Sequence, residues 1–294
     1  MKLKRILFPV GYALLLTAFS VYILLDTFVI GRVYGQVTAT VPTSPKVDDT
    51  PVITDNFYQD SQISITLTEY REHDTAIYVA DIRLADATYL KTALAKDTYG
   101  KNIKEKTSEM AENHGAILAV NGDYYGSRDE GYVLRNGVLY RDEGSKKRND
   151  LVIWPDGGFE VVSEKDTSAQ TLLEQGAWQV LSFGPALVEN GKVSVDEDTE
   201  VGQATYSNPR TAIAVVDDLH YLMVVSDGRT DRSDGLSLYQ LAGFLQSLGA
   251  KTAYNLDGGG SSTMWFNGRV INEPVNHGST VSERSISDIV YIGY

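Results

Sequence analysis

The chain has 294 residues, with 26 Lys and Arg against 39 Asp and Glu, a formal net charge of −13, and no Cys. The absence of Cys excludes disulfides, thiolate metal sites and a Cys nucleophile. A net negative charge disfavours non-specific binding to the phosphate backbone, so nucleic acid is not an expected partner. The four His residues show no HExxH-type spacing, which argues against histidine-based metal chemistry.

The N-terminus reads as a short cytoplasmic tail, residues 1–5, followed by a transmembrane signal-anchor, residues 6–30. Residues 6–25 are twenty uncharged, mostly apolar positions, enough for a helix to cross a hydrocarbon core of roughly 30 Å. The alternative is a cleaved signal peptide, but its apolar region is usually about 7–15 residues long and ends in an A-x-A-like site. Lys2, Lys4 and Arg5 should stay in the cytoplasm. We therefore expect a single-pass protein of the cell membrane with an extracellular C-terminal domain.

Residues 31–56 are rich in Thr, Pro, Val and Asp and lack an apolar period, which predicts an extended stalk. From residue 57 to residue 294, short apolar runs are separated by turn residues. These runs predict strands at 63–67, 76–80, 117–120, 151–154, 212–216, 221–225, 263–266 and 269–271.

Three Asn-Gly pairs, at 136–137, 190–191 and 267–268, lie between apolar runs and predict hairpins. One amphipathic helix is expected from Ser237 to Leu248, with Ser237 as its N-cap and Gly249 ending it. Residues 107–114 and 168–175 are weaker helical candidates. Many strands, few helices and no regular strand–helix repeat predict a single α+β domain that is mixed and strand-rich, with a few packed helices.

The densest polar motif is Asn255-Leu-Asp-Gly-Gly-Gly-Ser-Ser262, between two predicted strands. Consecutive glycines weaken a strand, but they allow the backbone to approach a ligand closely and to aim N–H groups at an anion. Asp257 would then lie at the rim as a carboxylate. The alternative is a glycine-rich bulge in which Asp257 and Asn255 make only local bonds.

Two arginines lie at the ends of predicted strands. Arg210 opens one of these strands, where its planar guanidinium could hold a phosphate or carboxylate; otherwise it is a surface residue in a turn. Asp227 and Arg229 follow the apolar run 221–225, at a strand end where sites are often built. A simple turn centred on Asp227-Gly228 is the alternative.

Two further groups could contribute to a site. Asn121, Asp123 and Tyr124 follow another predicted strand, and an aromatic ring beside Asn and Asp is common at carbohydrate sites. Arg284 is a candidate second cation, or else the partner of a surface salt bridge with Glu283 or Asp288.

Together these motifs resemble the phosphodiester glycosidase family. The matching stretches keep the family's order and lie at 119–125, 182–187 with 191–192, 209–213, 225–229, 235–241, 249–262 and 283–285. They span roughly residues 63 to 294, and the Asn-Leu-Asp-Gly-Gly-Gly-Ser stretch is highly specific in this context. One departure is Asp123, where much of the family is expected to have Gly.

The resemblance implies hydrolysis of the bond between an anomeric carbon and a phosphodiester, with a phosphate-linked glycan of the cell envelope or an exopolysaccharide as substrate. Asp257 and Asp227 are then the first candidates for catalytic carboxylates, with Asp123 third. Substrate would be bound by Arg210, Arg229, Arg284, Asn121, Tyr124, Asn255, Gly258, Gly259, Gly260 and Ser261. No cofactor is required, although carboxylates could hold Ca²⁺ or Mg²⁺. Two alternatives stay open: a non-catalytic factor that binds or assembles anionic glycans, and a metal-dependent phosphodiesterase.

Overall fold

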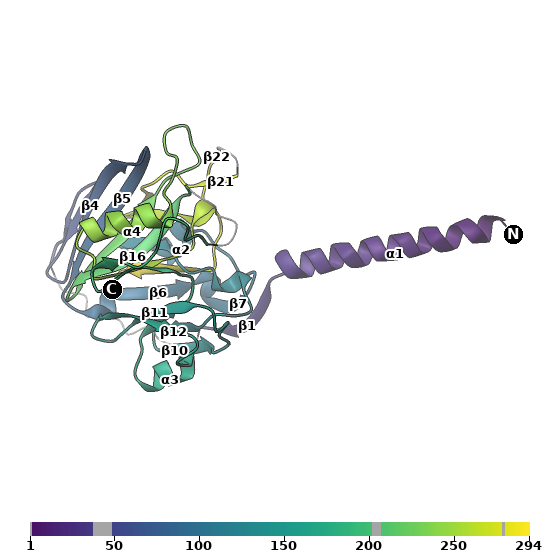
Figure 1. The fold of residues 1–294 in the computed structure, drawn as a ribbon, viewed down its shortest axis with the longest axis horizontal. Coiled ribbons are helices and arrows are strands. Elements are labelled where there is room, and N and C mark those ends of the chain that lie inside the picture. The colour runs from purple at the N-terminus through teal and green to yellow at the C-terminus, as the bar shows by residue number, and fades with distance from the viewer. Residues whose placement is uncertain (1, 38–48, 202–206, 278–279) are drawn as a thin grey trace.

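The computed structural model describes residues 2–37, 49–201, 207–277 and 280–294, which form a strand-rich domain and one helix projecting from it (Figure 1). The predicted α+β class is confirmed. Among the described residues the α-helices are α1 (Lys2–Phe28), α2 (Thr107–Asn113), α3 (Ala169–Glu174) and α4 (Leu238–Ser247). Short 3₁₀ turns are η1 (Ala87–Tyr89), η2 (Ala95–Asp97), η3 (Tyr125–Ser127) and η4 (Gly259–Ser261).

The largest sheet has nine strands in the order β15-β14-β18-β16-β17-β5-β4-β3-β2. Its neighbouring strands pair antiparallel. The strands are β2 (Val52–Ile53), β3 (Phe57–Gln59), β4 (Ile63–Glu72), β5 (Thr75–Leu84), β14 (Ala186–Glu189), β15 (Lys192–Val193), β16 (Arg210–Asp217), β17 (His220–Ser226) and β18 (Thr252–Asn255). Every residue of β17 is buried, which explains its continuous apolar sequence.

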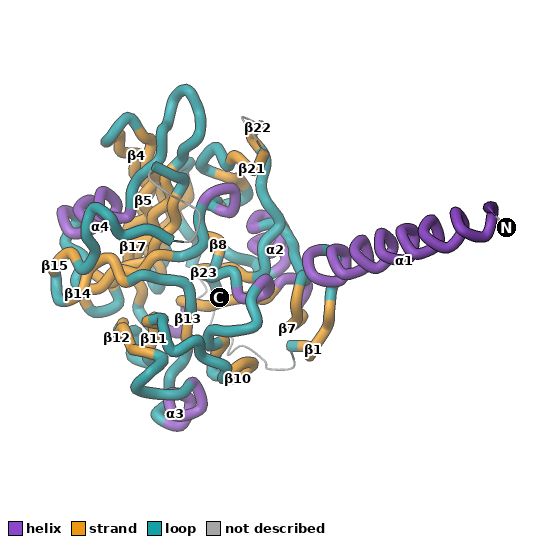
Figure 2. Tube along the Cα trace, turned by 45° about the vertical axis from the view of Figure 1, so that its right-hand side comes forward, coloured by secondary structure: helices purple, strands orange, loops and turns teal. Residues whose placement is uncertain are grey.

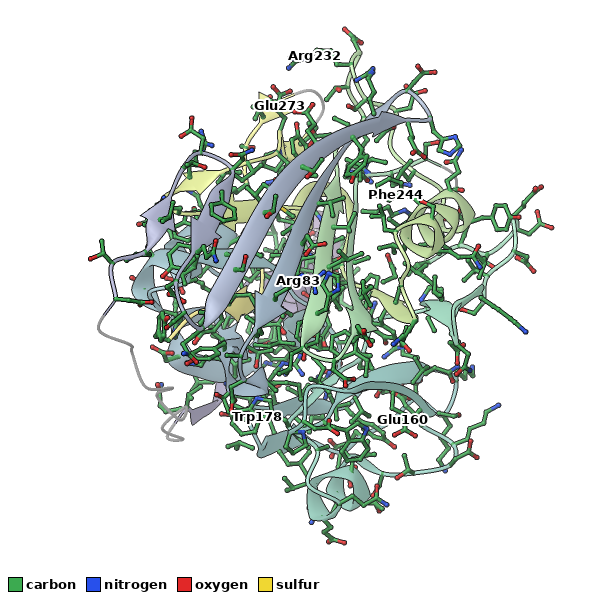
Figure 3. All side chains as sticks on the ribbon, turned by 90° about the vertical axis from the view of Figure 1, so that its left-hand side faces the viewer. Arg83, Glu160, Trp178, Arg232, Phe244 and Glu273 are labelled. Carbon is green, nitrogen blue, oxygen red and sulfur yellow. The ribbon has the colours of Figure 1, made fainter. Side chains whose placement is uncertain are left out.

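Two five-stranded sheets complete the domain. One has the order β20-β19-β8-β23-β6, with β6 (Leu90–Leu94), β8 (Leu118–Asn121), β19 (Met264–Phe266), β20 (Arg269–Val270) and β23 (Asp288–Ile292). The other has the order β10-β9-β13-β11-β12, with β9 (Val133–Arg135), β10 (Val138–Arg141), β11 (Asn149–Ile153), β12 (Phe159–Ser163) and β13 (Gln179–Leu181). Figure 3 shows this second sheet at the bottom of the domain, where Trp178 and Glu160 are labelled. Two further pairs are β1 (Arg32–Gln36) with β7 (Thr98–Lys101), and β21 (Val275–His277) with β22 (Thr280–Val281).

The main hydrophobic core lies between the nine-stranded sheet and the two smaller sheets. Ile65, Ile82 and Met223 from the large sheet pack in one cluster with Val120 of β8 and Ile153 of β11. Side chains from the inner faces of the sheets thus interdigitate, as in other layered β structures. This contact fixes the position of β8 relative to β16, β17 and β18, and the candidate site lies where those strands end.

Helices α2, α3 and α4 pack against the sheets. Leu241 and Leu245 of α4 pack against Ala212 and Leu222 of the nine-stranded sheet, and Phe244, labelled in Figure 3, has its ring centroid 5.4 Å from that of Tyr70. Helix α2 contacts β8 and β23, and α3 contacts β9 and β10. Figure 2 shows α4 and α3 at different ends of the domain. The predicted cap of α4 is confirmed, because Ser237 Oγ accepts a hydrogen bond from Gln240 N at 3.1 Å.

The three predicted Asn-Gly hairpins are confirmed at β9–β10, β14–β15 and β19–β20. Both residues of each pair have positive φ, for example +50° at Asn136 and +75° at Gly137. These angles are those of the type I′ turns that match the twist of paired strands. The dipeptides therefore set the register of three hairpins locally.

Parts of the segment predicted as an extended stalk, residues 31–56, pair with strands of the domain. β1 pairs antiparallel with β7 of the domain, and β2 forms the edge of the nine-stranded sheet. Asn102 Nδ2 also donates to the backbone oxygens of Thr27, at 3.0 Å, and Ile30, at 3.3 Å. Only three residues separate the end of α1 from β1. Backbone pairing therefore attaches the chain to the domain directly after the helix, and residues 38–48 of the predicted stalk lie outside the described residues.

Candidate active site

Antiparallel register brings separate sequence motifs to one edge of the nine-stranded sheet. Arg210 at the start of β16 pairs with Ser226 at the end of β17, and Ala212 pairs with Asn255 at the end of β18. The residues that follow β17 and β18 therefore emerge beside Arg210. This explains how Arg229 and Asp257 reach the same place from distant parts of the sequence.

A cavity of about 400 Å³ lies at this edge. The predicted site residues that line it are Tyr124, Arg210, Arg229, Asn255, Asp257, Gly258, Gly259 and Arg284. The other lining residues are Arg128, Phe183, Val201 and Leu256. Asp257 and Arg210 thus share one cavity, which a common catalytic or binding role requires.

Four guanidinium groups line the cavity, and among the described residues only that of Arg210 forms a salt bridge. Arg210 Nη2 lies 3.2 Å from Glu200 Oε2. Arg229 instead donates to Asn208 Oδ1, at 2.7 Å from Nη2, and Arg284 Nε donates to Asn276 Oδ1 at 2.9 Å. Within the described part of the chain, neither of these two nor Arg128 forms a salt bridge. Burial lowers the pKa of Arg229, and the positive charge of nearby Arg284 lowers it further. The cavity is therefore strongly positive in a chain of net charge −13 and suits an anion.

The glycine run allows these cations to lie against the backbone. A Cβ added to Gly260 would be 2.7 Å from Arg284 Nη2, and one added to Gly259 would be 3.1 Å from Arg229 Nη2. Gly259 also has φ of +62°, a conformation that favours glycine. A Cβ at Gly258 would be 2.8 Å from the carbonyl oxygen of Pro209. The three glycines are thus needed for close packing around the cavity.

The structure corrects one part of the glycine interpretation, which expected the N–H groups of the run to point at an anion. Gly259 N donates to Pro209 O at 2.8 Å, and Gly258 N donates to the Asp257 carboxylate at 2.9 Å. Both donors are occupied by the protein. Gly258 and Gly259 therefore contribute space to the cavity, and the positive charge comes from guanidinium groups.

Asp257 is the predicted carboxylate that lines the cavity. Its Oδ1 accepts the Gly258 N–H, and its Oδ2 is buried without a hydrogen-bond partner among the described residues. Burial raises the pKa of Asp257, while the Ser261 hydroxyl and the charges of Arg284 and Arg128 act in the opposite direction. An unsatisfied carboxylate oxygen costs free energy when buried, so a ligand or water that bonds to Oδ2 would be stabilised.

Other polar atoms near Asp257 also lack partners within the described chain. These are Asn255 Oδ1 and the hydroxyls of Ser262 and Thr263, all buried. Asn255 Nδ2 donates to Gly184 O at 2.8 Å, which fixes its amide. Unsatisfied buried groups are uncommon in folded proteins, and a cluster of them beside a cavity is typical of a ligand site.

Asn121 does not line the cavity but holds the backbone of Asp257, which does. Its Nδ2 donates to the carbonyl oxygen of Asp257 at 2.6 Å, and its Oδ1 accepts from Thr211 Oγ1 at 2.8 Å. Asp257 N in turn donates to Gly122 O at 3.1 Å. These bonds join β8 to the loop after β18 and position the Asp257 backbone.

Asp227 lies outside the cavity lining, although the sequence made it a catalytic candidate. Its Oδ1 accepts from Glu273 N at 2.9 Å and Asn272 Nδ2 at 3.2 Å, and its Oδ2 accepts from Tyr78 Oη at 3.3 Å. The side chain is thus occupied by three donors from the protein. This arrangement ties the end of β17 to β5 and to the loop after β20.

Asp123 is also absent from the cavity lining and belongs to a buried ion cluster. Its Oδ2 lies 2.7 Å from Arg135 Nη2, which also contacts Asp288 Oδ2 at 2.9 Å. Asp123 Oδ2 further accepts from Ser182 N at 2.7 Å. Two carboxylates share one guanidinium in a dry environment, and burial together with Asp123 raises the pKa of Asp288. Asp123 therefore bonds to the protein rather than facing a substrate.

Sequence reasoning missed Arg128 and Phe183. The Arg128 guanidinium carbon lies 4.7 Å from the ring centroid of Phe183 and 5.5 Å from that of Tyr124. Phe183 lies in the stretch 182–187 that resembles the family, so the resemblance could have indicated it as a site residue. Arg128 carries no local signal, because only the turn at η3 brings it to the cavity. Among the described residues, no three His, Asp or Glu side chains are grouped to hold a metal ion.

The layered α+β domain carries a cationic cavity lined by Asp257, and among the described residues Asp257 Oδ2 has no hydrogen-bond partner. Residues 114–293 match the family model for phosphodiester glycosidases, more than half of the chain. The chain belongs to the phosphodiester glycosidase family, which confirms the resemblance and places it among hydrolases.

Several curated proteins are similar in sequence. The uncharacterized SPbeta prophage-derived protein YomE of Bacillus subtilis is 30% identical over 201 residues, 67% of this chain and 31% of the relative. The N-acetylglucosamine-1-phosphodiester alpha-N-acetylglucosaminidase of Mus musculus is 29% identical over 174 residues, 57% of this chain and 34% of the relative. The chain therefore spans about a third of the length of these relatives.

The fold is similar to that of a solved catalytic domain. The zebrafish N-acetylglucosamine-1-phosphodiester alpha-N-acetylglucosaminidase catalytic domain, described as auto-inhibited by its pro-peptide, superposes with a TM-score of 0.62 at 21% identity. The superposition covers 90% of this chain and 89% of that domain. At this identity the likeness concerns the fold.

Proposed function

We propose that the cavity hydrolyses the bond between the anomeric carbon of a sugar and the phosphate of a sugar-1-phosphodiester. Water oxygen bonds to the anomeric carbon, the carbon–oxygen bond to phosphate breaks, and its electron pair leaves on the phosphate oxygen. The products are a reducing sugar and a phosphate monoester. The observation that carries this proposal is the presence of Asp257 and four guanidinium groups in one cavity.

The arginines would stabilise the charge that develops on the leaving phosphate. A phosphate monoester is already a good leaving group, so cations can replace the general acid that ordinary glycosides need. Among the described residues, Arg128, Arg229 and Arg284 form no salt bridge and donate hydrogen bonds to neutral groups. Their positive charge is therefore available to an anion, and fixed donors of this kind stabilise a transition state without reorganisation.

Asp257 would act on the sugar side of the bond. The anomeric carbon develops positive, oxocarbenium-like character, which a nearby carboxylate stabilises as base, nucleophile or charge partner. The pKa of Asp257 is raised by burial, and a carboxylate with a raised pKa accepts a proton more readily near neutral pH. The Asp257 carboxylate, which lines the cavity, is the group that we assign to this role.

The test is the product analysis of a defined sugar-1-phosphodiester by ³¹P NMR, using the full chain with and without chelator. Release of phosphate monoester and reducing sugar is the expected result in both conditions. Release of sugar-1-phosphate, lost with chelator, would instead identify a metal-dependent phosphodiesterase. Saturable binding without product would identify a glycan-binding factor.

Two variants locate the reaction. Asp257→Asn should lower kcat by about 10²–10⁴, the range for removing a group that acts in the transition state. Asp218→Asn removes a carboxylate exposed at the end of the β16–β17 hairpin and should leave kcat unchanged. Equal kcat for the parent chain and Asp257→Asn would contradict the proposed site.

We also propose that α1 anchors the protein in the cell membrane with the domain outside. Residues Pro9–Phe28 have a mean hydropathy of 1.6 and are unburied, so they are long and apolar enough to span a bilayer. The chain has no Cys, so single Cys residues can be introduced cleanly at Lys2 and at Lys165. A membrane-impermeant maleimide applied to intact cells should label Lys165→Cys but not Lys2→Cys; the reverse pattern would invert the topology.

A further inference from the structure

A second cavity adjoins the candidate active site. It has a volume of about 340 Å³, and its lining includes Lys147 and Arg148 from the segment before β11. Phe183 and Val201 line both cavities. Glu200, on the wall of the second cavity, lies 3.2 Å from Arg210 of the first. The two cavities are therefore adjacent and share lining residues.

The second cavity is also positively charged. In the part of the chain that the structure describes, neither Lys147 nor Arg148 forms a salt bridge, and Arg148 Nη1 donates to the backbone oxygen of Glu130 at 3.3 Å. Glu200 is the acidic side chain in this lining, and Arg210 balances its charge. The lining therefore has an excess of positive charge.

Electrostatic coupling indicates that the two cation groups lie close together. The positive charge of Arg148 lowers the pKa of Arg128 in the first cavity, after the larger effect of burial. The carboxylates of Asp123 and Asp257 act on the pKa of Arg128 in the opposite direction, but like charges held near each other still favour an anion between or beside them. An extended anionic ligand that reaches both cavities would neutralise both groups.

We propose that the second cavity binds a further phosphate of the same substrate, so that the substrate is a chain of sugars joined by phosphodiesters. This inference rests on the proposed function and names its substrate class. Lys147 and Arg148 hold the phosphate that neighbours the one being cut, while Asp257 and the first cavity hold the scissile bond. Binding at a second linked site raises apparent affinity through effective concentration, and each phosphate–arginine contact is charge-assisted.

The experiment compares substrates that differ in the number of phosphates. One substrate is a sugar-1-phosphodiester of methanol, with one phosphate, and the others are oligomers of the same sugar with two, four and eight phosphodiester units. We expect kcat/KM per cleavable bond to rise at least about tenfold from the methyl diester to the longer oligomers at low salt. Because ionic contacts are screened by salt, this ratio should fall towards one at high salt.

Variants test whether the second cavity causes the length dependence. Lys147→Ala combined with Arg148→Ala should reduce the ratio of kcat/KM for the octamer over the methyl diester to about one. Lys147→Glu, at an exposed side chain, tests the same contact without removing the Arg148 hydrogen bond. The matched control combines Lys165→Ala with Lys192→Ala, which removes two exposed positive charges outside both cavities and should keep the ratio.

The outcomes separate this inference from the proposed function. Turnover with the same kcat/KM per bond for all lengths, or a length dependence that survives Lys147→Glu and the double variant, would overturn the second subsite while leaving the activity intact. If the parent chain turns over no substrate, the proposed function fails. The dissociation constants of the methyl diester and the octamer, measured by calorimetry on Asp257→Asn, then decide: tighter octamer binding that is lost in Lys147→Glu supports the subsite, and equal binding overturns it.

Discussion

Arg284 Nη2 lies 2.7 Å from the point that a Cβ of Gly260 would occupy. Real Cβ contacts of this length are essentially absent from folded proteins, so one of the two groups would have to move. Arg284 Nε is held by Asn276 Oδ1 at 2.9 Å. The absence of a side chain at residue 260 thus allows a cation to lie directly against the loop that carries Asp257.

Gly260→Ala should displace the Arg284 guanidinium and lower kcat/KM by about 10–10³-fold, because a misplaced charge stabilises the leaving phosphate less well. Steady-state kinetics on a sugar-1-phosphodiester gives the effect, with circular dichroism to check folding.

A second glycine provides the matched control. Gly243 lies in α4 and is exposed, and a Cβ added to it would have no heavy atom within 4 Å. Gly243→Ala should leave kcat/KM unchanged and stabilise the fold by roughly 0.5–1 kcal/mol, the usual helix-interior preference for Ala. Equal activity of the two variants would show that the Gly260–Arg284 contact is irrelevant to turnover.

The pH dependence of activity should reflect Asp257. Burial raises its pKa, and the carboxylate is the form that stabilises positive charge on the sugar. Activity should therefore rise with pH through an acidic limb that lies above the ordinary aspartate value of about 3.9. Since the charge of Arg284 opposes the rise in pKa, Arg284→Ala should move this limb to still higher pH. A log kcat/KM profile with its limb at or below pH 4, unchanged in Arg284→Ala, would exclude Asp257 as the titrating group.

Several features of the fold could be predicted because they depend on local sequence. Asn136-Gly137 and Asn267-Gly268 adopt positive φ and turn between paired strands, as Asn-Gly does in many contexts. Ser237 caps α4 through a bond three residues along the chain. Arg210 and Asp257 could be placed together because their motifs belong to one set that resembles the family.

The roles of the other carboxylates depend on partners that are distant in sequence. Asp123 and Asp227 follow strands, as catalytic residues often do, and nothing local distinguishes them from Asp257. Asp123 is bonded to Arg135 and to Ser182 N, and Asp227 to Asn272 and Tyr78. Only the packing of the sheets decides which carboxylate faces an open cavity. The pairing of β1 with β7 was missed for the same reason, since the sequence of β1 has no apolar period.

Asp227 should act mainly on stability. The Asp227 carboxylate accepts hydrogen bonds from Glu273 N, Asn272 Nδ2 and Tyr78 Oη. Asp227→Asn replaces one carboxylate oxygen with an NH2 group, which would face at least one of these donors. Leaving buried donors without acceptors costs about 1–3 kcal/mol, which urea unfolding can measure. Asp218→Asn, at an exposed carboxylate, should change neither stability nor rate. A fall in kcat as large as that of Asp257→Asn, with unchanged stability, would restore Asp227 as a catalytic candidate.

Asp150 should make stability depend on pH. Its side chain is fully buried, and neither carboxylate oxygen has a hydrogen-bond partner in the described chain. Burial, and the nearby Glu164 carboxylate, raise the pKa of Asp150 to about 8. The folded protein therefore keeps a proton that the unfolded chain has lost above about pH 4. Because the folded state binds more protons than the unfolded state, stability falls as pH rises from about 4 to about 8.

Asp150→Asn removes this linkage with almost no change in shape. At pH 7 the variant should be more stable than the parent by on the order of 2–4 kcal/mol, because each pKa unit corresponds to about 1.4 kcal/mol. At pH 4, where Asp150 is protonated in the folded state and about half protonated in the unfolded chain, the two proteins should differ little. Urea unfolding of both proteins at pH 4, 6 and 8 measures the difference. If the stability of the parent relative to Asp150→Asn is the same at pH 8 as at pH 4, then Asp150 is ionised in the folded protein and another group must compensate its charge.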